Sequence, residues 1–249
     1  MKRQKTYLLL IILSLCLGFC SAQATSPDGA GGYFANPAKL GAVEGREVLL
    51  GKNDPFGWGD SELQYSFLWG TPKVGMGLEY SAFQAFDYDY RERKYALGFG
   101  KKVTQHFSVG AGVSFESIRS LENASGSFGS LGVLYQSGRL ETGLAYQHFG
   151  RYSWSTKSKQ AVPGELQASL KIQHTEKLAY LFGHSSAVPR KITSAIRWLP
   201  ITGLALQLED GASGLQFGLS LSTRGVAINY SLAQSDLGIG SQLTLGFKL

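Results

Sequence analysis

Four histidines are the side chains in this sequence of 249 residues that could most readily bind a metal or act as a general base. The spacing of His106, His148, His174 and His184 fits no zinc-ligand pattern. Both cysteines, Cys16 and Cys20, lie within the first two dozen residues, so a cysteine-based site is not expected in the mature chain. We therefore expect no metal and no cofactor.

The carboxylates offer no better case for catalysis. Asp87 and Asp89 in "DYDYRER" could form a carboxylate pair, but Arg91 and Arg93 follow directly, which is typical of a solvated, ion-paired loop. No nucleophile-elbow motif and no phosphate-binding loop is present. The sequence thus predicts a protein that is not an enzyme and has no catalytic residues.

The start of the chain reads as a secretory leader. Lys2, Arg3 and Lys5 precede an apolar run, and Ala22-Gln23-Ala24 is a small-x-small cleavage site, so residues 1–24 are predicted to be a signal peptide. Lipidation of Cys20 is an open alternative, although Phe19 stands where that motif needs a small residue. Removing the three basic residues lowers the formal charge from +6 to +3 (6 − 3). A charge of this size is not typical of a nucleic-acid-binding protein.

The remaining chain alternates apolar with small or polar residues. In "HFSVGAGVSFE" the alternate positions from Phe107 to Phe115 are apolar, and those from Ser108 to Glu116 are small or polar. A period of two is the strand signature, and about fourteen such segments follow one another from Glu44. They are predicted to begin near Glu44, Ser61, Lys73, Arg93, Phe107, Gly126, Arg139, Glu165, Leu178, Arg190, Gly203, Gly214, Val226 and Gln242. The many glycines fall inside these runs, where small residues suit a wall that faces a crowded interior. The sequence predicts an all-β, antiparallel fold.

The connections differ in length between successive segments. Those predicted after even-numbered strands are short, as in 70–72 and 137–138, whereas 52–60, 85–93 and 150–164 are the longest. This parity, with aromatic residues near the strand ends, is typical of outer-membrane barrels. The predicted girdle residues are Tyr65, Trp69, Tyr80, Phe83, Tyr95, Tyr146, Phe149, Trp198 and Tyr230. A soluble lipocalin-like barrel is the competing interpretation, because periodicity alone does not say which face meets water.

Two stretches carry a family resemblance. "GGYFANPAKLG" resembles the Asn-Pro-Ala signature of FadL-type fatty-acid transporters and of the related PorV/PorQ-type proteins, and "INYSLAQSDLGIGSQLTLGFKL" (228–249) is similar to their last hairpin. The resemblance implies a transmembrane barrel of about fourteen strands over 44–249, preceded at 25–43 by a plug or periplasmic segment. Asn36, Pro37 and Ala38 would form its compact turn, and Leu245, Phe247 and Leu249 in the last strand would be the signal for barrel assembly.

The resemblance leaves two functions open. The first is a non-enzymatic outer-membrane protein of the PorV/PorQ-like group, with a role in type IX secretion or outer-membrane organisation. The alternative is a FadL-like passive transporter of hydrophobic small molecules such as long-chain fatty acids. The expected partners are outer-membrane lipid, the barrel-assembly machinery, and either secretion-system components or a hydrophobic ligand. The inward faces, rich in Gly, Ser, Gln, Thr, Lys and Glu, favour the first function.

Overall fold

The computed structural model describes residues 30–54, 57, 61–85, 90–120, 122–155, 159–186, 192–211, 214–235 and 238–249. The predicted leader, with Cys16 and Cys20, lies outside the described residues, as do Asp87 and Asp89 of the predicted solvated loop.

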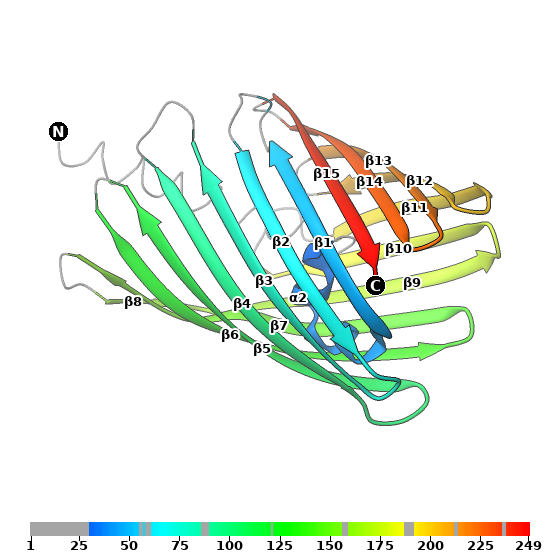
Figure 1. Ribbon diagram of the computed structural model, residues 1–249, viewed down its shortest axis with the longest axis horizontal. Helices are drawn as coiled ribbons and strands as arrows, with labels where there is room; N and C mark the ends of the chain where they lie inside the picture. Colours follow the sequence, from blue (N-terminus) through cyan, green and yellow to red (C-terminus); the bar gives the residue numbers. More distant parts are fainter. Residues whose placement is uncertain are drawn as a thin grey trace.

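Two short helices precede a single antiparallel sheet that closes on itself (Figure 1). The helices are α2 (Ala30–Ala35) and the 3-10 helix η1 (Pro37–Ala42). The strands are β1 (Gly45–Asp54), β2 (Ser61–Gly70), β3 (Val74–Gln84), β4 (Arg91–Lys102), β5 (Phe107–Arg119), β6 (Ala124–Ser137), β7 (Leu140–Trp154), β8 (Lys159–Val162), β9 (Glu165–Thr175), β10 (Leu178–Ser185), β11 (Ile192–Ile201), β12 (Leu204–Gly211), β13 (Gly214–Thr223), β14 (Val226–Ser235) and β15 (Gly238–Lys248).

Pairing of β1 with β15 joins the first strand to the last, from Glu47 opposite Lys248 to Asp54 opposite Ser241. Strand β8 pairs only with the end of β7, whereas β9 pairs with the rest of β7 and continues the wall. Fourteen strands therefore close the barrel, which confirms the predicted fold class. The segment 150–164 was predicted as one long loop, and this is wrong: β7 runs on to Trp154 and turns back as β8.

The apolar side chains face outward, as the alternation predicted. On β5, Phe115 is 56 % exposed, while the neighbouring Glu116 points inward and is 9 % exposed. The predicted girdle residues lie on this outer face with one exception: Phe83 points inward and packs edge-on against Tyr90, with ring centroids 6.0 Å apart. Within the described chain, neither helix is long or apolar enough to cross a membrane.

The two ends of the barrel are different. The C-terminus and the short turns lie at one end, here called the turn end, including Ser137–Leu140 and Thr223–Val226. The opposite end, here called the loop end, holds the longer connections, although β12–β13 and β14–β15 are joined there by two residues each. The strands are unequal too, since β7 has 15 residues and β10 has 8. The wall therefore extends furthest at the loop end over β4–β8.

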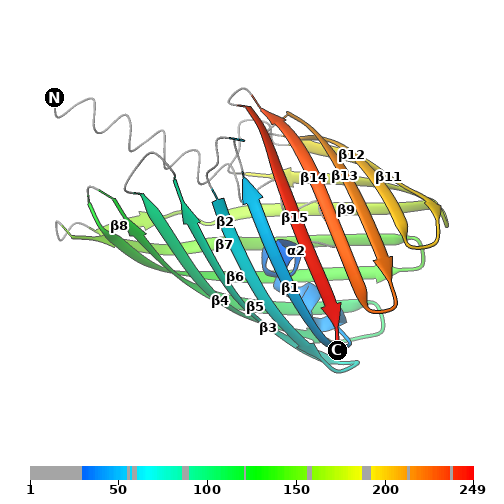
Figure 2. The same cartoon turned by 45° about the horizontal axis from the view of Figure 1, so that its top comes forward.

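The N-terminal segment, residues 30–43, lies inside the barrel. In two views, α2 and η1 lie between the strands β1–β3 in front and β7 and β9 behind (Figures 1 and 2). Helix η1 packs mainly against β4 and β5, and to a lesser extent against β3 and β6. The chain then leaves the lumen at the turn end and enters β1 at Gly45, which has a φ of 83°.

Candidate functional site

The Asn-Pro-Ala motif joins the N-terminal segment to the barrel wall. Asn36 is the N-cap of η1, and its Oδ1 accepts a hydrogen bond of 3.1 Å from the Ala38 amide. Its Nδ2 donates to the Val133 carbonyl of β6, also at 3.1 Å. Pro37 follows at the first helical position, where its missing N–H costs nothing. One asparagine side chain thus starts the helix and fixes it to the wall.

A row of glycines on the inner face makes room for this helix. Directly paired residues of five neighbouring strands form the row, here called the glycine row: Gly70, Gly75, Gly100, Gly110 and Gly132. A Cβ built on Gly110 would lie 2.2 Å from the Pro37 carbonyl carbon, and one built on Gly75 would lie 1.9 Å from the Leu40 carbonyl oxygen. The backbone of η1 therefore touches the backbone of the wall, and only glycine allows this approach.

Apolar contacts complete the packing at the turn end. Leu40 of η1 is fully buried and clusters with Val43, Leu49 and Leu68, while the rings of Tyr33 and Phe34 cover the cluster. Full burial of one leucine contributes about 1.5–3 kcal/mol. The turn end of the lumen, on the β1–β6 side, is therefore a packed core rather than an open pore.

Buried polar residues occupy the middle of the same wall. Gln64 Nε2 donates to Glu79 Oε2 at 2.7 Å, and Lys94 Nζ lies 3.7 Å from Glu79 Oε1. Lys94 is also directly opposite Glu116 in the register of β4 and β5. The Gln64 amide, the Lys94 ammonium and the Glu79 carboxylate form a hydrogen-bonded and ion-paired network in the lumen, with Glu116 beside it.

The network continues onto β7 through a β-bulge. Gly129 pairs with Phe149 and Leu131 with Tyr146, so β7 carries one extra residue, and His148 has a φ of 56°. Beyond this point the alternation reverses, which turns Tyr152 inward. Tyr152 Oη donates to Glu116 Oε2 at 2.5 Å, and His148 Nδ1 lies 3.6 Å from Glu116 Oε1.

An aromatic cluster covers this network at the loop end of the lumen. The ring of Phe128 stacks on His148 at a centroid distance of 4.0 Å and meets Tyr152 edge-on at 4.8 Å. Ile118 and Ala124 are buried with them, and Tyr90, Trp154 and Val162 pack around the outside. This lumen-facing aromatic cluster comes from β5–β8 and is the largest departure from the polar interior that the sequence predicted.

The inward side chains on the opposite wall, β13 and β14, are less buried. The inward side chains of β13 and β14, among them Gln216, Ser220 and Asn229, are half-exposed rather than buried. Ser220 Oγ and Asn229 Oδ1 are 2.5 Å apart, so this face is polar and uncharged. The inner wall is therefore packed along β1–β7 and much of β9–β12, and the inner faces of β13 and β14 are partly accessible.

The residues of the predicted assembly signal lie on the outer face of β15. Leu245 pairs with Leu50 of β1 and with Ile228 of β14, and Phe247 pairs with Val48 and Val226. Leu249 follows the strand and is 77 % exposed. Nothing in the structure tests whether an assembly machinery reads these residues, so that role stays a prediction.

The candidate catalytic and metal-binding residues are scattered. His148 lies in the lumen, His106 and His174 lie at the turn end, and His184 is on the outer face near the loop end. Across the described ranges no three His, Cys, Asp or Glu side chains converge on a common metal position. The arrangement offers a largely packed lumen with a partly accessible polar face on β13 and β14.

Comparison with known proteins places this fold. No protein-family model and no curated protein matches the sequence. Among solved structures, the Pseudomonas putida toluene transporter TodX is similar with a TM-score of 0.62 and 12 % identity, over 89 % of this chain and 94 % of that one. A Pseudomonas aeruginosa FadL homologue is similar with a TM-score of 0.58 and 12 % identity, over 91 % of this chain and 95 % of that one. At such low identity the likeness concerns the fold alone, and the chain has the closed fourteen-stranded fold of FadL-type outer-membrane barrels.

Proposed function

We propose that this protein is an outer-membrane channel that lets small hydrophobic molecules cross passively. The apolar outer face is suited to lipid, and a closed sheet is one of the two backbone arrangements that satisfy all hydrogen bonds there. The turn end would face the periplasm and the loop end the cell exterior, following the usual arrangement of such barrels.

The lumen-facing aromatic cluster is the observation that carries the hydrophobic substrate class. It gathers Phe128, Tyr152, Trp154 and their apolar neighbours at the proposed entrance, above the polar network around Glu79. Aromatic rings bind flat apolar molecules through burial and offset stacking. The likeness to a barrel described as a toluene transporter supports the same substrate class.

The proposed passage runs beside the N-terminal segment rather than through it. Helix η1 touches the glycine row backbone to backbone, so that side of the lumen has no free width. The half-exposed inner faces of β13 and β14 leave the opposite side for passage. A molecule bound at the aromatic cluster would cross the lumen toward this wall on its way to the turn end.

Uptake by proteoliposomes tests the proposal. We expect vesicles containing the protein to take up toluene or a long-chain fatty acid faster than protein-free vesicles. Phe128→Ala should lower the rate because the buried ring is lost from the cluster, whereas Phe115→Ala on the lipid-facing side should not. Heat-modifiability on gels shows that each variant still forms a barrel. Uptake no faster than in protein-free vesicles would refute the transport function.

The PorV/PorQ-like function is the second candidate. The network of Gln64, Glu79 and Lys94 favours it, since a fixed polar interior suits a barrel that transports no hydrophobic molecules. Deleting the gene in a host with type IX secretion would test this role. A changed set of secreted proteins would support it, and an unchanged set would contradict it.

A further inference from the structure

Five basic side chains gather on the outer face of the barrel at its loop end. This basic patch consists of Arg91, Arg93, Arg119, Arg151 and Lys159, from β4, β5, β7 and β8. All five side chains are exposed. The strands that carry them are those that extend furthest beyond the rest of the wall.

The pairing register places four of these side chains in two rows, while Arg151 is in register with Phe115 through Ser127. Arg91 and Arg119 are direct partners. In the second row, a cation stands at each end of three paired serines, in the order Arg93, Ser117, Ser125, Ser153 and Lys159. Guanidinium, ammonium and hydroxyl groups together are the donors that bind phosphate.

The strands carry no carboxylate on this face, and the exposed Glu122 of the connection between β5 and β6 makes no ion pair within the described ranges. The other outward residues of these strand ends are serines and Ala161, and within the described ranges no acidic side chain forms an ion pair with any of the five cations. Like charges directly opposite each other on a sheet destabilise it, so Arg91 beside Arg119 calls for an anion between them. That anion must come from outside the described strands.

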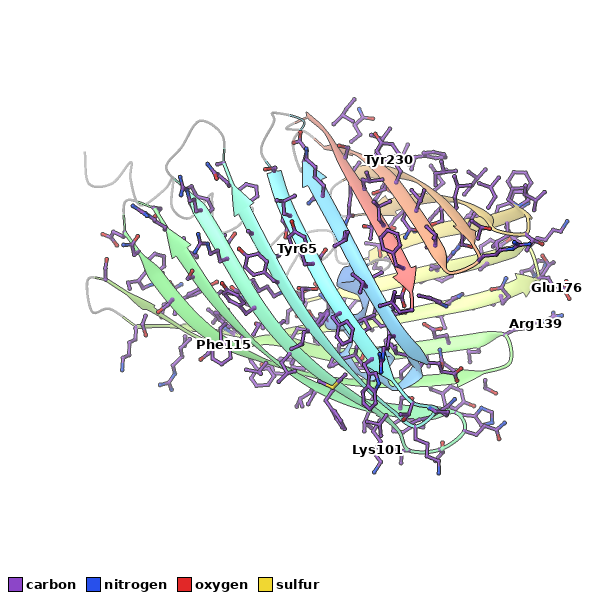
Figure 3. The ribbon with its side chains drawn as sticks, viewed as in Figure 1. Tyr65, Lys101, Phe115, Arg139, Glu176 and Tyr230 are labelled. Carbon is purple, nitrogen blue, oxygen red and sulfur yellow. The ribbon has the colours of Figure 1, made fainter. Side chains whose placement is uncertain are left out.

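Aromatic rings lie below the patch on β4 and β5 and continue onto β3 and β2. Tyr65, Tyr80, Tyr95 and Phe115 are successive direct partners on the outer face, each four residues from the loop end of its strand. The ring centroids of Tyr65 and Tyr80 lie 6.2 Å apart, and those of Tyr80 and Tyr95 lie 5.0 Å apart. Tyr65 and Phe115, the two ends of the row, are labelled in Figure 3. Rings on the lipid-facing side near a strand end mark the edge of the hydrocarbon layer.

Three of the cations lie beyond the rings of their own strands. Arg93 is two residues past Tyr95, and Arg91 and Arg119 are four residues past their rings. With a rise of about 3.3 Å per residue and a strand tilt of about 40°, these positions lie roughly 5 and 10 Å above the ring on the same strand. The headgroup layer of a bilayer begins at the hydrocarbon edge and is roughly 5–8 Å thick, so Arg93 lies within it and the long side chains of Arg91 and Arg119 reach back to it.

We propose that the basic patch binds the phosphate groups of an anionic lipid in the outer leaflet of the membrane. Arginine is suited to this because its planar fork holds a phosphate through two parallel hydrogen bonds. The proposal rests on the membrane orientation given under the proposed function, and it does not depend on transport. Its occupant is a lipid headgroup rather than free phosphate or an acidic polymer.

Lipid retention tests the proposal. The full chain is folded into phosphatidylcholine nanodiscs containing lipid A, either bis-phosphorylated or dephosphorylated, and bound lipid is counted by native mass spectrometry after detergent extraction. The wild type should retain bis-phosphorylated lipid A in preference to the dephosphorylated form. The variant R91Q/R119Q/R151Q should bind it about a hundredfold more weakly, at roughly fivefold per cation.

A matched variant removes the same charge at the other end. R46Q/R139Q/R224Q replaces three exposed arginines of the turn end and should retain lipid A like the wild type. Equal retention of both lipid A forms, or equal loss in both triple variants, would overturn the proposal. Displacement of lipid A by millimolar inorganic phosphate, or tighter binding of DNA than of lipid A, would refute the lipid as occupant.

The loop carboxylates supply a further control. The sequence predicts that Asp87 and Asp89 pair with Arg91 and Arg93, so D87N/D89N would free the arginines. Retention of lipid A should then stay the same or rise, and a loss would contradict the proposal. Uptake measured in pure phosphatidylcholine vesicles should be unaffected by R91Q/R119Q/R151Q, which separates lipid binding from transport.

Discussion

Replacing Gly110 by alanine should release the N-terminal segment from the wall. The added Cβ would lie 2.2 Å from the Pro37 carbonyl carbon and 2.4 Å from the Ala38 amide nitrogen, at least 1 Å inside the shortest ordinary contact of 3.4 Å. Both neighbours are backbone atoms held by the Asn36 cap, so no side chain can turn away. Overpacking of this kind costs about 1–3 kcal/mol.

This cost destabilises the docked position of residues 30–43 rather than the barrel wall, because Gly110 belongs to a strand that is hydrogen-bonded on both sides. A shift of about 1–3 kcal/mol raises the released population roughly 5- to 150-fold. Trypsin reports this population at the Lys39–Leu40 bond, since cleavage follows the open fraction when opening is faster than cutting. We expect the cleavage rate at this bond, followed by mass spectrometry, to rise by the same factor.

Gly218→Ala is the matched control. Gly218 also faces the lumen, but its Cβ would lie 3.5 Å from the Gln207 Cβ, which is ordinary contact. Gly75→Ala, with a Cβ 1.9 Å from the Leu40 carbonyl oxygen, should behave like Gly110→Ala. If both glycine-row variants are cut at the wild-type rate while still forming barrels, the glycine row does not hold the segment.

Three further substitutions test other parts of the structure. Asn36→Ala removes the cap and the hydrogen bond to the wall, and should raise cleavage at the same trypsin site by about five- to thirtyfold, for a cost of about 1–2 kcal/mol. Lys94→Met leaves the buried Glu79 without its ion pair and should lower the free energy of unfolding in urea by about 1–3 kcal/mol, with full recovery in the double variant that also carries Glu79→Leu. Leu131→Arg on the outer face should cost about 2–4 kcal/mol in lipid vesicles, whereas Ser220→Arg on the partly accessible inner face of β13 should cost less than about 1 kcal/mol. Equal costs for these two would contradict the assignment of the outer face to lipid.

Much of the barrel follows from period-two alternation and turn residues alone. The strands predicted to start at Ser61, Phe107, Glu165, Leu178, Gly214 and Val226 start at those residues. The last strand was predicted from Gln242 and begins at Gly238, because Gly238 and Gly240 hide the alternation there. A local pattern is sufficient in these places because each strand must present one apolar face along its whole length.

The glycine row and the basic patch could not be predicted in this way. Both depend on which residues of different strands stand opposite each other, and register is a property of the pair rather than of either strand. Asn-Pro-Ala could be recognised as a turn, but its contact with Val133 spans 97 residues of sequence and appears only once the barrel closes.

The bulge at His148 explains the largest error in the predicted lumen. An unbroken alternation carried through β7 puts Tyr152 on the outer face with Tyr146, and the extra residue turns it inward. No glycine marks the position, since His148 itself adopts the positive φ. The bulge therefore places in the lumen, beside Phe128, an aromatic side chain that unbroken alternation would put on the lipid face, and there it forms part of the hydrophobic site of the proposed channel. Tyr152→Ala removes this ring and its hydrogen bond to Glu116, and should dismantle the cluster and lower uptake of toluene while leaving a heat-modifiable barrel; uptake at the wild-type rate would show that the cluster is not the entrance.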